Sequence, residues 1–386
     1  MVDKILFEVK EENLETGMRG YPVGYCVTSF VDSVKGLHYC NQPVSAIANR
    51  PPQEVIYLLV YGKEGTEKEI STFYNELKKR SVCSTAIVDQ IYKLPREGHP
   101  MKLFSAALLL LEMHDKTGEY RLDCLNIIAK LPHLVACIIN HHAGWGETAR
   151  PNFDLGYMEA FAEMVRVPGK NGARKEMFKL FNVLHYDHGG GNLSAFVGKA
   201  VASGLEGLLG SLSAAMNALS GPRHGSANQV TLDFVKEIFE EAGEEAREEE
   251  IEALIRDRLA KKKLVYGFGH AVLRVEDPRA TLLYDFAEKH YPDHPLVKIA
   301  LLLRKAGTKV LKENPKIANP YPNVDAISGT LLTAAGFPYP EYFTLLFGLS
   351  RCVGISIQIV YERLEAREGK GTPIVRPRYL YKARFS

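Results

Sequence analysis

The sequence predicts an all-α protein with two helical domains. Its 386 residues exceed the usual size of a single compact domain, so two hydrophobic cores are expected. Apolar residues recur with helical spacing along most of the chain, and alternation with a period of two is confined to residues 5–10 and 25–31. These two short segments predict one small β-ribbon near the start of an otherwise helical protein.

Apolar residues spaced three and four apart predict the helices one by one. Within residues 103–111 they fall on one face of a helix, and the same pattern recurs further along the chain. The charge-dense residues 240–263 fit this pattern too, since their acidic residues come first and their lysines follow, as the helix dipole favours. The later helices are predicted over residues 205–219, 234–241, 251–259, 282–290, 297–311 and 342–364.

Composition excludes several classes of protein. The chain is 46% hydrophobic and 24% charged, and its 48 Lys plus Arg against 46 Asp plus Glu give a formal charge of +2. General nucleic-acid and membrane-surface binders carry a large positive excess, so neither partner is expected. The longest apolar run, around residues 106–111, stops at Glu112 and is too short to span a membrane.

Cysteine usage and the first residues bear on the compartment. The six cysteines lie far apart with no C-x-x-C pair, which is typical of reduced, buried thiols and of neither a disulfide framework nor a zinc site. Residues 1–16 alternate acidic residues and lysines and show neither a secretory nor a transit-peptide pattern. We expect a cytoplasmic protein, with the mature form of an organellar protein as the alternative.

The first motif is HYDHGGGN, residues 185–192. His188 followed by three glycines matches the oxyanion loop of esterases, but the chain has no G-x-S-x-G nucleophile elbow to go with it. A metal site formed by His185, Asp187 and His188 is an alternative, although no motif such as H-E-x-x-H supports it. We favour a glycine-rich turn that lets His188 approach a small polar ligand.

The second motif, residues 220–229, places His224 between Gly-Pro and Gly, just before a helical pattern that starts near Ala227. A histidine at a helix N-terminus has its charged form disfavoured, so it stays neutral and can donate a hydrogen bond. The alternative is a histidine that caps the helix or fills the core.

The third motif, residues 266–280, contains G-x-G, but its sixth position is Val272 and the dinucleotide-binding fingerprint fails. The turn presents His270, followed by Arg274 and Arg279. Two arginines beside a histidine suggest bidentate capture of a carboxylate or phosphate, with surface salt bridges as the alternative.

The remaining motifs carry one aspartate and two arginines. In NPYPNVD, residues 319–325, two prolines stiffen the approach to Asp325, which is either a functional carboxylate or a helix N-cap. Arg351 ends the block FGLSR. Arg376 lies between prolines in an extended tail, where it is either a surface residue or part of an arm that reaches another subunit.

Together these five blocks resemble the citrate synthase family. HYDHGGGN, GPRHGSANQ, GFGHAVLR-x-x-DPR, NPYPNVD and FGLSR match that family's signature blocks in order, spacing and glycine context, and the resemblance runs from about residue 16 to 381. The residues of the GFGHAVLR and GPRHG blocks are closer to those of the eukaryote-like branch of the family. The resemblance implies a large helical domain over 1–224 and 335–386, and a smaller one over 225–334 that closes over the active site.

The family condenses acetyl-CoA with oxaloacetate and hydrolyses the resulting thioester, so the resemblance also implies roles for single residues. His224, His270 and Asp325 match the catalytic trio. Asp325 would take a proton from the acetyl methyl group, a neutral His224 would donate to the thioester oxygen, and His270 would donate to the ketone of oxaloacetate.

The second substrate is a dicarboxylate, for which the site needs fixed cations and hydrogen-bond donors. The positions that match substrate-binding residues of the family are His188, Asn192, Arg279, Arg351 and Arg376. Arg274 matches a position that meets the CoA phosphate, and Arg376 would reach across from the other subunit of a homodimer. No metal or redox cofactor is implied, because CoA arrives as a substrate.

Two other functions remain open at this point. A 2-methylcitrate synthase would use propionyl-CoA with the same catalytic residues, and one methylene is worth only about 1–3 kcal/mol of discrimination. A non-catalytic helical scaffold dimer belongs to another class, although a scaffold would need none of these histidines and arginines.

Overall fold

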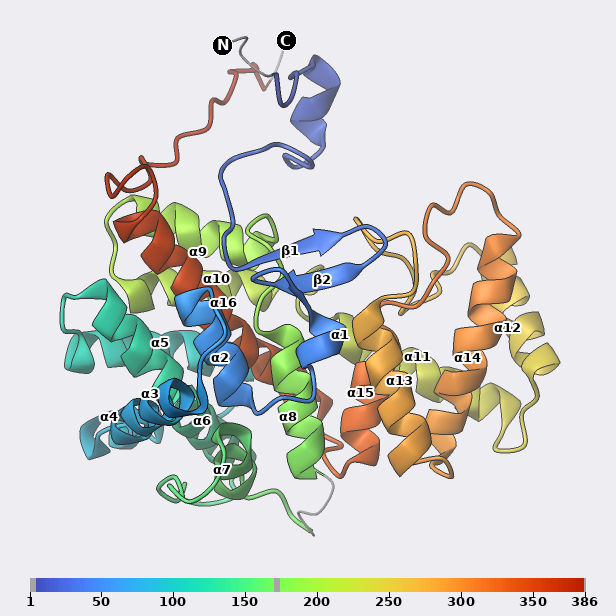
Figure 1. Cartoon of the computed structure of the whole chain (residues 1–386). Helices are drawn as coiled ribbons and strands as arrows, with labels where there is room; N and C mark the ends of the chain where they lie inside the picture. The colour runs from blue at the N-terminus through green and yellow to red at the C-terminus, as the bar shows by residue number, and fades with distance from the viewer. Residues whose placement is uncertain (1–4, 170–173, 385–386) are drawn as a thin grey trace.

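The computed structural model describes residues 5–169 and 174–384, and in that part of the chain helices dominate (Figure 1). The helices are α1 (Val44–Ile47), α2 (Pro52–Tyr61), α3 (Glu67–Arg80), α4 (Thr85–Ile91), α5 (Pro100–Asp115), α6 (Tyr120–Ala143), α7 (Tyr157–Met164), α8 (Arg174–His185), α9 (Leu193–Ser203), α10 (Leu208–Leu219), α11 (Ala227–Ala242), α12 (Glu248–Ala260), α13 (Pro278–His290), α14 (Pro295–Lys312), α15 (Asp325–Ala334) and α16 (Phe343–Leu364). Two short 3₁₀ helices, η1 (Glu11–Glu15) and η2 (Pro340–Tyr342), complete the helical elements. The all-α prediction is confirmed.

The helices form two groups. Helices α11 to α15 pack on one another, with α12 against α14 and α11 against α15, and they occupy the right side of Figure 1 in yellow and orange. In the other group α16 packs against α6, α8, α9 and α10. The groups meet where α15 contacts α8 and α11 contacts α16, which brings the motif-bearing loops of both groups near one boundary.

Two of the core helices are long and apolar enough to resemble membrane spans. In α6 and α16 the most apolar 18-residue stretches are 78% and 94% buried inside the protein, which is typical of helices in the core of a soluble protein. Among the described residues these two helices are the ones long and apolar enough to cross a membrane. The apolar run around residues 106–111, which the sequence analysis singled out, lies in the shorter helix α5. Helix α6 begins where Glu119 accepts hydrogen bonds from the backbone N–H of Arg121 and Leu122, and it ends at Gly144 in the left-handed conformation.

The β-ribbon is smaller than predicted. Strands β1 (Ser29–Asp32), β2 (Gly36–Tyr39) and β3 (Gln42–Pro43) form an antiparallel sheet in which Ser29 pairs with Tyr39. The strand predicted over residues 25–31 thus starts only at Ser29, and the strand predicted over 5–10 is wrong. Residues 5–10 have no regular structure, and Ile5, Leu6 and Val9 are exposed, since none of the described strands pairs with them.

Each helix predicted from the sequence is present, with bounds that differ by a few residues. The pattern over 205–219 corresponds to α10, which starts three residues later at Leu208, and the pattern over 234–241 is the second half of α11. The sequence analysis missed the other helices between residues 44 and 203.

Candidate active site

The HYDHGGGN block forms the turn between α8 and α9. Gly189 adopts φ +71°, a conformation that favours glycine, and Asn192 caps α9 by accepting a hydrogen bond from the N–H of Ala195 at 3.1 Å. The Asn192 side chain also donates to the Gly189 carbonyl at 3.0 Å. The turn that presents His188 is therefore closed by its own last residue.

His224 is held in one tautomer. Its Nε2 accepts a hydrogen bond from the backbone N–H of Ser194 at 3.2 Å and lies 3.0 Å from the Ser194 hydroxyl. Because a backbone N–H can only donate, Nε2 carries no proton and the ring proton is on Nδ1. Burial, with a smaller contribution from the nearby charge of Arg351, lowers the pKa of His224 to about 4. The imidazole is neutral at physiological pH and has one N–H to donate.

His270 is held in the opposite tautomer. Its Nδ1 accepts from the backbone N–H groups of Val272 and Leu273, both at 3.0 Å, so the proton is on Nε2. Burial and then the charge of Arg279 lower the pKa of His270. Its ring lies 5.5 Å from the His188 ring, edge to face. The two histidine-bearing turns, about 80 residues apart in the sequence, therefore meet.

The loop that carries His270 is joined to the loop that precedes Asp325. Gly269 donates its backbone N–H to the Tyr321 carbonyl at 3.0 Å, and Asn323 donates to the Gly267 carbonyl at 2.9 Å. Gly267 has φ +81°, and a side-chain carbon at this position would lie 2.8 Å from the Cα of Ala326. Only glycine allows this close approach, which fixes the His270 turn against the start of α15.

Asp325 is the first residue of α15 and is only partly exposed. The N-cap position belongs to Val324, and the Asp325 side chain makes no capping hydrogen bond, so the N-cap interpretation does not describe it. Burial raises the pKa of Asp325 to about 6, while the charges of Arg279 and Arg351 act in the opposite direction. This carboxyl is therefore a stronger base than an ordinary aspartate.

Arg279 is buried in the centre of this cluster. It forms an ion pair with Asp277, with 2.7 Å between Nη2 and Oδ2, and the same Nη2 donates to Nε2 of His188 at 3.3 Å. Since a guanidinium only donates, His188 accepts through Nε2 and keeps its proton on Nδ1. Burial and then Arg279 hold the pKa of His188 well below its usual value. The surface salt bridge considered for Arg279 is wrong, because both partners of the pair are buried.

Arg351 is also buried. Its Nε donates to the His185 carbonyl at 3.1 Å, and its guanidinium carbon lies 4.7 Å from the centre of the Phe347 ring. Burial lowers the pKa of Arg351 to about 10, and the charge of Asp187 opposes that shift most strongly. Among the ion pairs of the described residues, none involves Arg351, so it is a cation with remaining capacity for an anion.

The metal-site interpretation of this region is not favoured by the geometry. The Nδ1 of His185 lies 2.7 Å from the Phe181 carbonyl, and its ring stacks on the Phe181 ring, as in a core histidine. The oxygens of Asp187 are taken up by hydrogen bonds. Over residues 5–169 and 174–384 there is no group of three or more side chains arranged to hold a metal ion.

Two of the predicted residues lie outside the cluster. Arg274 is exposed and donates to the carbonyls of Val272 and Leu273 at 3.0 and 2.8 Å, beside the His270 turn. Arg376 is exposed in the C-terminal segment, which has no regular structure and extends away from the helical body next to the N-terminal segment (Figure 1). Within this one chain Arg376 contributes nothing to the cluster.

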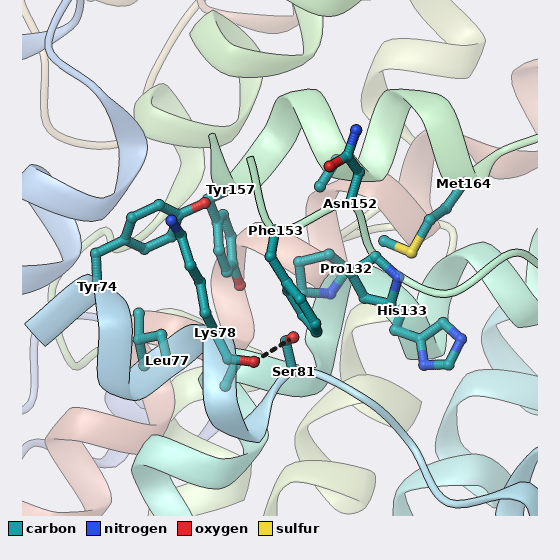
Figure 2. Close-up of a pocket in the computed structure, with 13 residues that line it drawn as sticks. Tyr74, Leu77, Lys78, Ser81, Pro132, His133, Asn152, Phe153, Tyr157 and Met164 are labelled. Carbon is teal, nitrogen blue, oxygen red and sulfur yellow. Dashed lines mark hydrogen bonds between the residues drawn. The ribbon is translucent and has the colours of Figure 1, made fainter. Parts of the chain in front are cut away.

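A separate cavity lies between α3, α6 and α7, where Lys78, His133 and Phe153 contribute to its walls (Figure 2). Its volume is about 30 Å³, which is enough for a water molecule but not for a metabolite. The Nδ1 of His133 accepts from the N–H of Cys83 at 3.0 Å, and burial lowers the pKa of His133 to about 4. Both features are typical of a core histidine.

The sequence analysis missed two residues that build the cluster and considered a third, Asp187, only as a metal ligand. Asp277 pairs with Arg279 and caps α13, Ser194 sets the tautomer of His224, and Asp187 binds the turn of His188. Asp277 stands directly before Pro278, a typical N-cap signal that the analysis did not use. The role of Ser194 and the hydrogen-bonding role of Asp187 could be found only from contacts between distant segments.

Comparison with known proteins agrees with the motifs. A family model described as the C-terminal domain of citrate synthase matches residues 17–378. The chain belongs to the citrate synthase family. Mitochondrial citrate synthase 4 of Arabidopsis thaliana is 33% identical over 371 residues, covering 90% of this chain and 78% of that protein. Mitochondrial citrate synthase of Daucus carota is 33% identical over 94% of this chain and 80% of its own length.

Solved structures of the family have the same fold. The crystal structure of citrate synthase from Pyrobaculum aerophilum superposes with a TM-score of 0.83 at 27% identity, over 96% of this chain and 93% of that one. The helical fold of the family thus accounts for nearly the whole chain.

The prediction of a cytoplasmic protein is contradicted by this comparison, because the plant relatives are mitochondrial by name. A compartment is set by a targeting signal that is read by a receptor. Charge balance and reduced cysteines describe the folded body and do not identify the compartment.

Proposed function

We propose that this chain catalyses the condensation of acetyl-CoA with oxaloacetate and water to give citrate and CoA. The observation that carries the proposal is the arrangement of His224, His270 and Asp325. The two imidazoles are neutral with their protons on opposite ring nitrogens, and the carboxyl has a raised pKa. Such a set can remove a proton from a carbon acid and donate to two carbonyl oxygens.

In the first step Asp325 takes a proton from the methyl group of acetyl-CoA. An ordinary aspartate is a weak base for this task, and each unit of pKa mismatch costs about 1.4 kcal/mol. The pKa of about 6 for Asp325, against an ordinary value of 3.8, removes roughly 3 kcal/mol of that mismatch. The Nδ1–H of His224 donates to the thioester oxygen and stabilises the enol as it forms.

In the second step the enol carbon attacks the ketone carbon of oxaloacetate. The Nε2–H of His270 donates to the ketone oxygen, which makes the carbon more electrophilic and stabilises the alkoxide that forms. The product is citryl-CoA. Water then cleaves its thioester, which releases CoA and citrate, and this chemistry needs no metal or redox cofactor.

Oxaloacetate is held by the cations and donors around His188. Arg279 and Arg351 present buried guanidinium groups for its carboxylates, and His188 and Asn192 lie on the adjoining turn. Arg351 has no carboxylate partner among the described residues, so a substrate carboxylate supplies the missing counter-charge. Arg274, exposed beside the same loop, is a candidate to meet the CoA phosphate.

We propose that residues 225–334 form a smaller domain that moves against residues 1–224 and 335–386. Helices α11 to α15 pack mainly on one another, and the loops bearing His270 and Asp325 belong to this group. Closure would exclude water while the enol exists and would complete the acetyl-CoA site after oxaloacetate has bound.

We further propose a homodimer in which Arg376 completes the partner's site. The C-terminal segment exposes apolar side chains that a monomer would leave in water, with Tyr379 and Tyr381 92% and 94% exposed. The N-terminal segment beside it exposes Tyr25 to 83%. Exposed large apolar side chains of this kind are typical of a protein–protein contact, and the C-terminal segment would then carry Arg376 onto a second copy.

A non-catalytic scaffold is disfavoured by the cost of the buried cations. Removing Arg351 from water is expensive, and its lowered pKa reflects that expense. A protein with only a structural role would be more stable with an apolar residue at this position, whereas a dicarboxylate-binding enzyme needs the charge.

The function is tested by measuring CoA release from acetyl-CoA and from propionyl-CoA, each with and without oxaloacetate. We expect release only when oxaloacetate is present, and faster with acetyl-CoA at equal concentration. Faster release from propionyl-CoA would instead identify a 2-methylcitrate synthase. No release by the folded protein with either ester would reject the proposal.

A further inference from the structure

Asp187 is fully buried beside His188 and has no assigned role in the reaction. Its Oδ1 accepts the backbone N–H of His188 at 2.9 Å and the Nε2 of Gln358 at 2.7 Å. Its Oδ2 accepts the hydroxyls of Thr28 and Ser29, the latter at 2.8 Å. One carboxylate thus joins the histidine turn, the central helix α16 and the start of the β-ribbon.

The groups bound by Asp187 also hold the residue that follows His188. The hydroxyl oxygen of Ser29 accepts the backbone N–H of Gly189 at 2.7 Å, and Nε2 of Gln358 lies 3.3 Å from the Gly189 carbonyl. The backbone on both sides of His188 is therefore fixed by a network with Asp187 at its centre. A glycine-rich turn is otherwise free to move, because glycine permits many backbone conformations.

The position of the His188 ring depends on this turn. Its Nε2 meets Arg279 at 3.3 Å, and its ring meets His270 edge to face. A shift of about 1 Å in the backbone would break the contact with Arg279, because hydrogen bonds weaken steeply beyond about 3.5 Å. The distance between His188 and Arg279 must stay fixed if both side chains are to contact the same small dicarboxylate.

The β-ribbon extends the network to the other side of the site. At the tip of the ribbon, the backbone carbonyl of Ser33 accepts a hydrogen bond from the backbone N–H of Arg274 at 2.8 Å. Gly36 packs against Pro278, one residue from Arg279. The same ribbon that binds Asp187 at its start therefore touches the loop that carries Arg274 and Arg279 at its tip.

We propose that Asp187 is a positioning residue for oxaloacetate, which holds His188 in register with Arg279 through its hydrogen bonds to the turn and to the β-ribbon. The inference rests on the proposed function. It predicts that loss of these bonds weakens oxaloacetate binding and leaves acetyl-CoA binding nearly unchanged.

The test compares Asp187→Ala with Asp187→Asn. Both variants lose the negative charge. In Asp187→Asn the amide oxygen can still accept the N–H of His188, and the amide NH₂ can donate hydrogen bonds to the hydroxyl oxygens of Thr28 and Ser29. We expect Asp187→Ala to raise the KM for oxaloacetate roughly ten- to hundredfold, the value of one or two hydrogen bonds to a charged group. Asp187→Asn should stay within about threefold of the wild type, since removing a negative charge does not by itself weaken anion binding.

A matched control is Asp123→Ala. Asp123 is a buried carboxylate at the start of α6 that accepts the N–H and the hydroxyl of Thr117, at 2.9 and 2.7 Å, in the loop before that helix. The Asp123→Ala variant should have a lower Tm and unchanged KM values for oxaloacetate and acetyl-CoA. If Asp187→Ala does not fold, Ser29→Ala removes the hydroxyl shared by Asp187 and Gly189 and should raise the oxaloacetate KM alone.

Three results would overturn the inference. An unchanged oxaloacetate KM in a folded Asp187→Ala or Ser29→Ala variant would show that the network does not position His188. An equal rise in both Asp187 variants would mean that charge, not hydrogen bonding, is what matters. An equal rise in the KM for acetyl-CoA would indicate general damage. The proposed function is tested by a different result, because it is rejected if the wild-type protein releases no CoA.

Discussion

Replacing the proposed base by its neutral isostere, Asp325→Asn, should make the protein more stable while it abolishes turnover. The folded protein raises the pKa of Asp325 from 3.8 to about 6, mainly through burial. The charged carboxylate is thus less favourable in the folded state than in the unfolded chain, and asparagine does not ionise. Function and stability are in conflict at this position.

The size of the effect follows from the pKa shift. A shift of about 2 units at 1.36 kcal/mol per unit gives up to about 3 kcal/mol of unfolding free energy. For an acid whose pKa is raised on folding, the stabilising contribution is complete below the unfolded pKa of 3.8 and is lost as the pH rises through about 6. The gain from asparagine should therefore be present at pH 7.5 and absent near pH 4. Among the described residues no hydrogen bond involves the Asp325 carboxylate, so asparagine loses none.

The assay is reversible urea unfolding of the wild type and Asp325→Asn at pH 7.5 and at the lowest pH that preserves the fold. Asp277→Asn is the matched control with the opposite sign, because it leaves Arg279 buried without its ion-pair partner and should cost roughly 3–5 kcal/mol. A destabilised Asp325→Asn, or a gain that is the same at both pH values, would refute the reasoning about burial.

Three further predictions use other parts of the site. Below about pH 6 the kcat/KM for oxaloacetate should fall about tenfold per pH unit as Asp325 is protonated, and a profile flat to pH 4 would contradict its assignment as the base. Gly36→Val should raise the KM for oxaloacetate, because its Cβ would lie 2.6 Å from Pro278, whereas the control Gly62→Val has a similar positive φ and open space around it. Coexpressed Arg376→Ala and Arg279→Ala subunits should recover about a quarter of wild-type activity if Arg376 crosses the dimer, because half of the dimers then contain one intact site. Recovery should be absent if each subunit uses its own arginine.

The helical class followed from periodicity, but periodicity failed for the long buried helix α6. Helix α6 buries residues on every side, from Cys124 to His141, so it has no single apolar face for the pattern to reveal. The short amphipathic pattern over residues 5–10 failed for the opposite reason. It has the alternation of a strand, but a strand needs a hydrogen-bonding neighbour, and none lies beside it among the described residues.

The histidines and Asp325 of the candidate site could be named from the sequence, because glycine and proline mark the turns beside them. Their protonation could not. The tautomer of His224 is set by the N–H of Ser194, which lies 30 residues away, and the pKa of Asp325 is set by burial that only the packed structure creates. The choice between N-cap and functional carboxylate for Asp325 likewise required the hydrogen bonds of the folded loop.

The two buried arginines connect binding to catalysis. Their positive charges help keep His188 and His224 neutral, and they also hold the pKa of Asp325 below the value that burial alone would give. In the proposed mechanism the carboxylates of oxaloacetate neutralise Arg279 and Arg351, which removes that restraint, so the pKa of Asp325 should rise and make it a better base. On this proposal Asp325 is the strongest base only after oxaloacetate has bound, which would protect acetyl-CoA from enolisation without a partner. The acidic limb of kcat, which reports the substrate complex, should consequently lie at higher pH than the limb of kcat/KM for oxaloacetate, which reports the free enzyme.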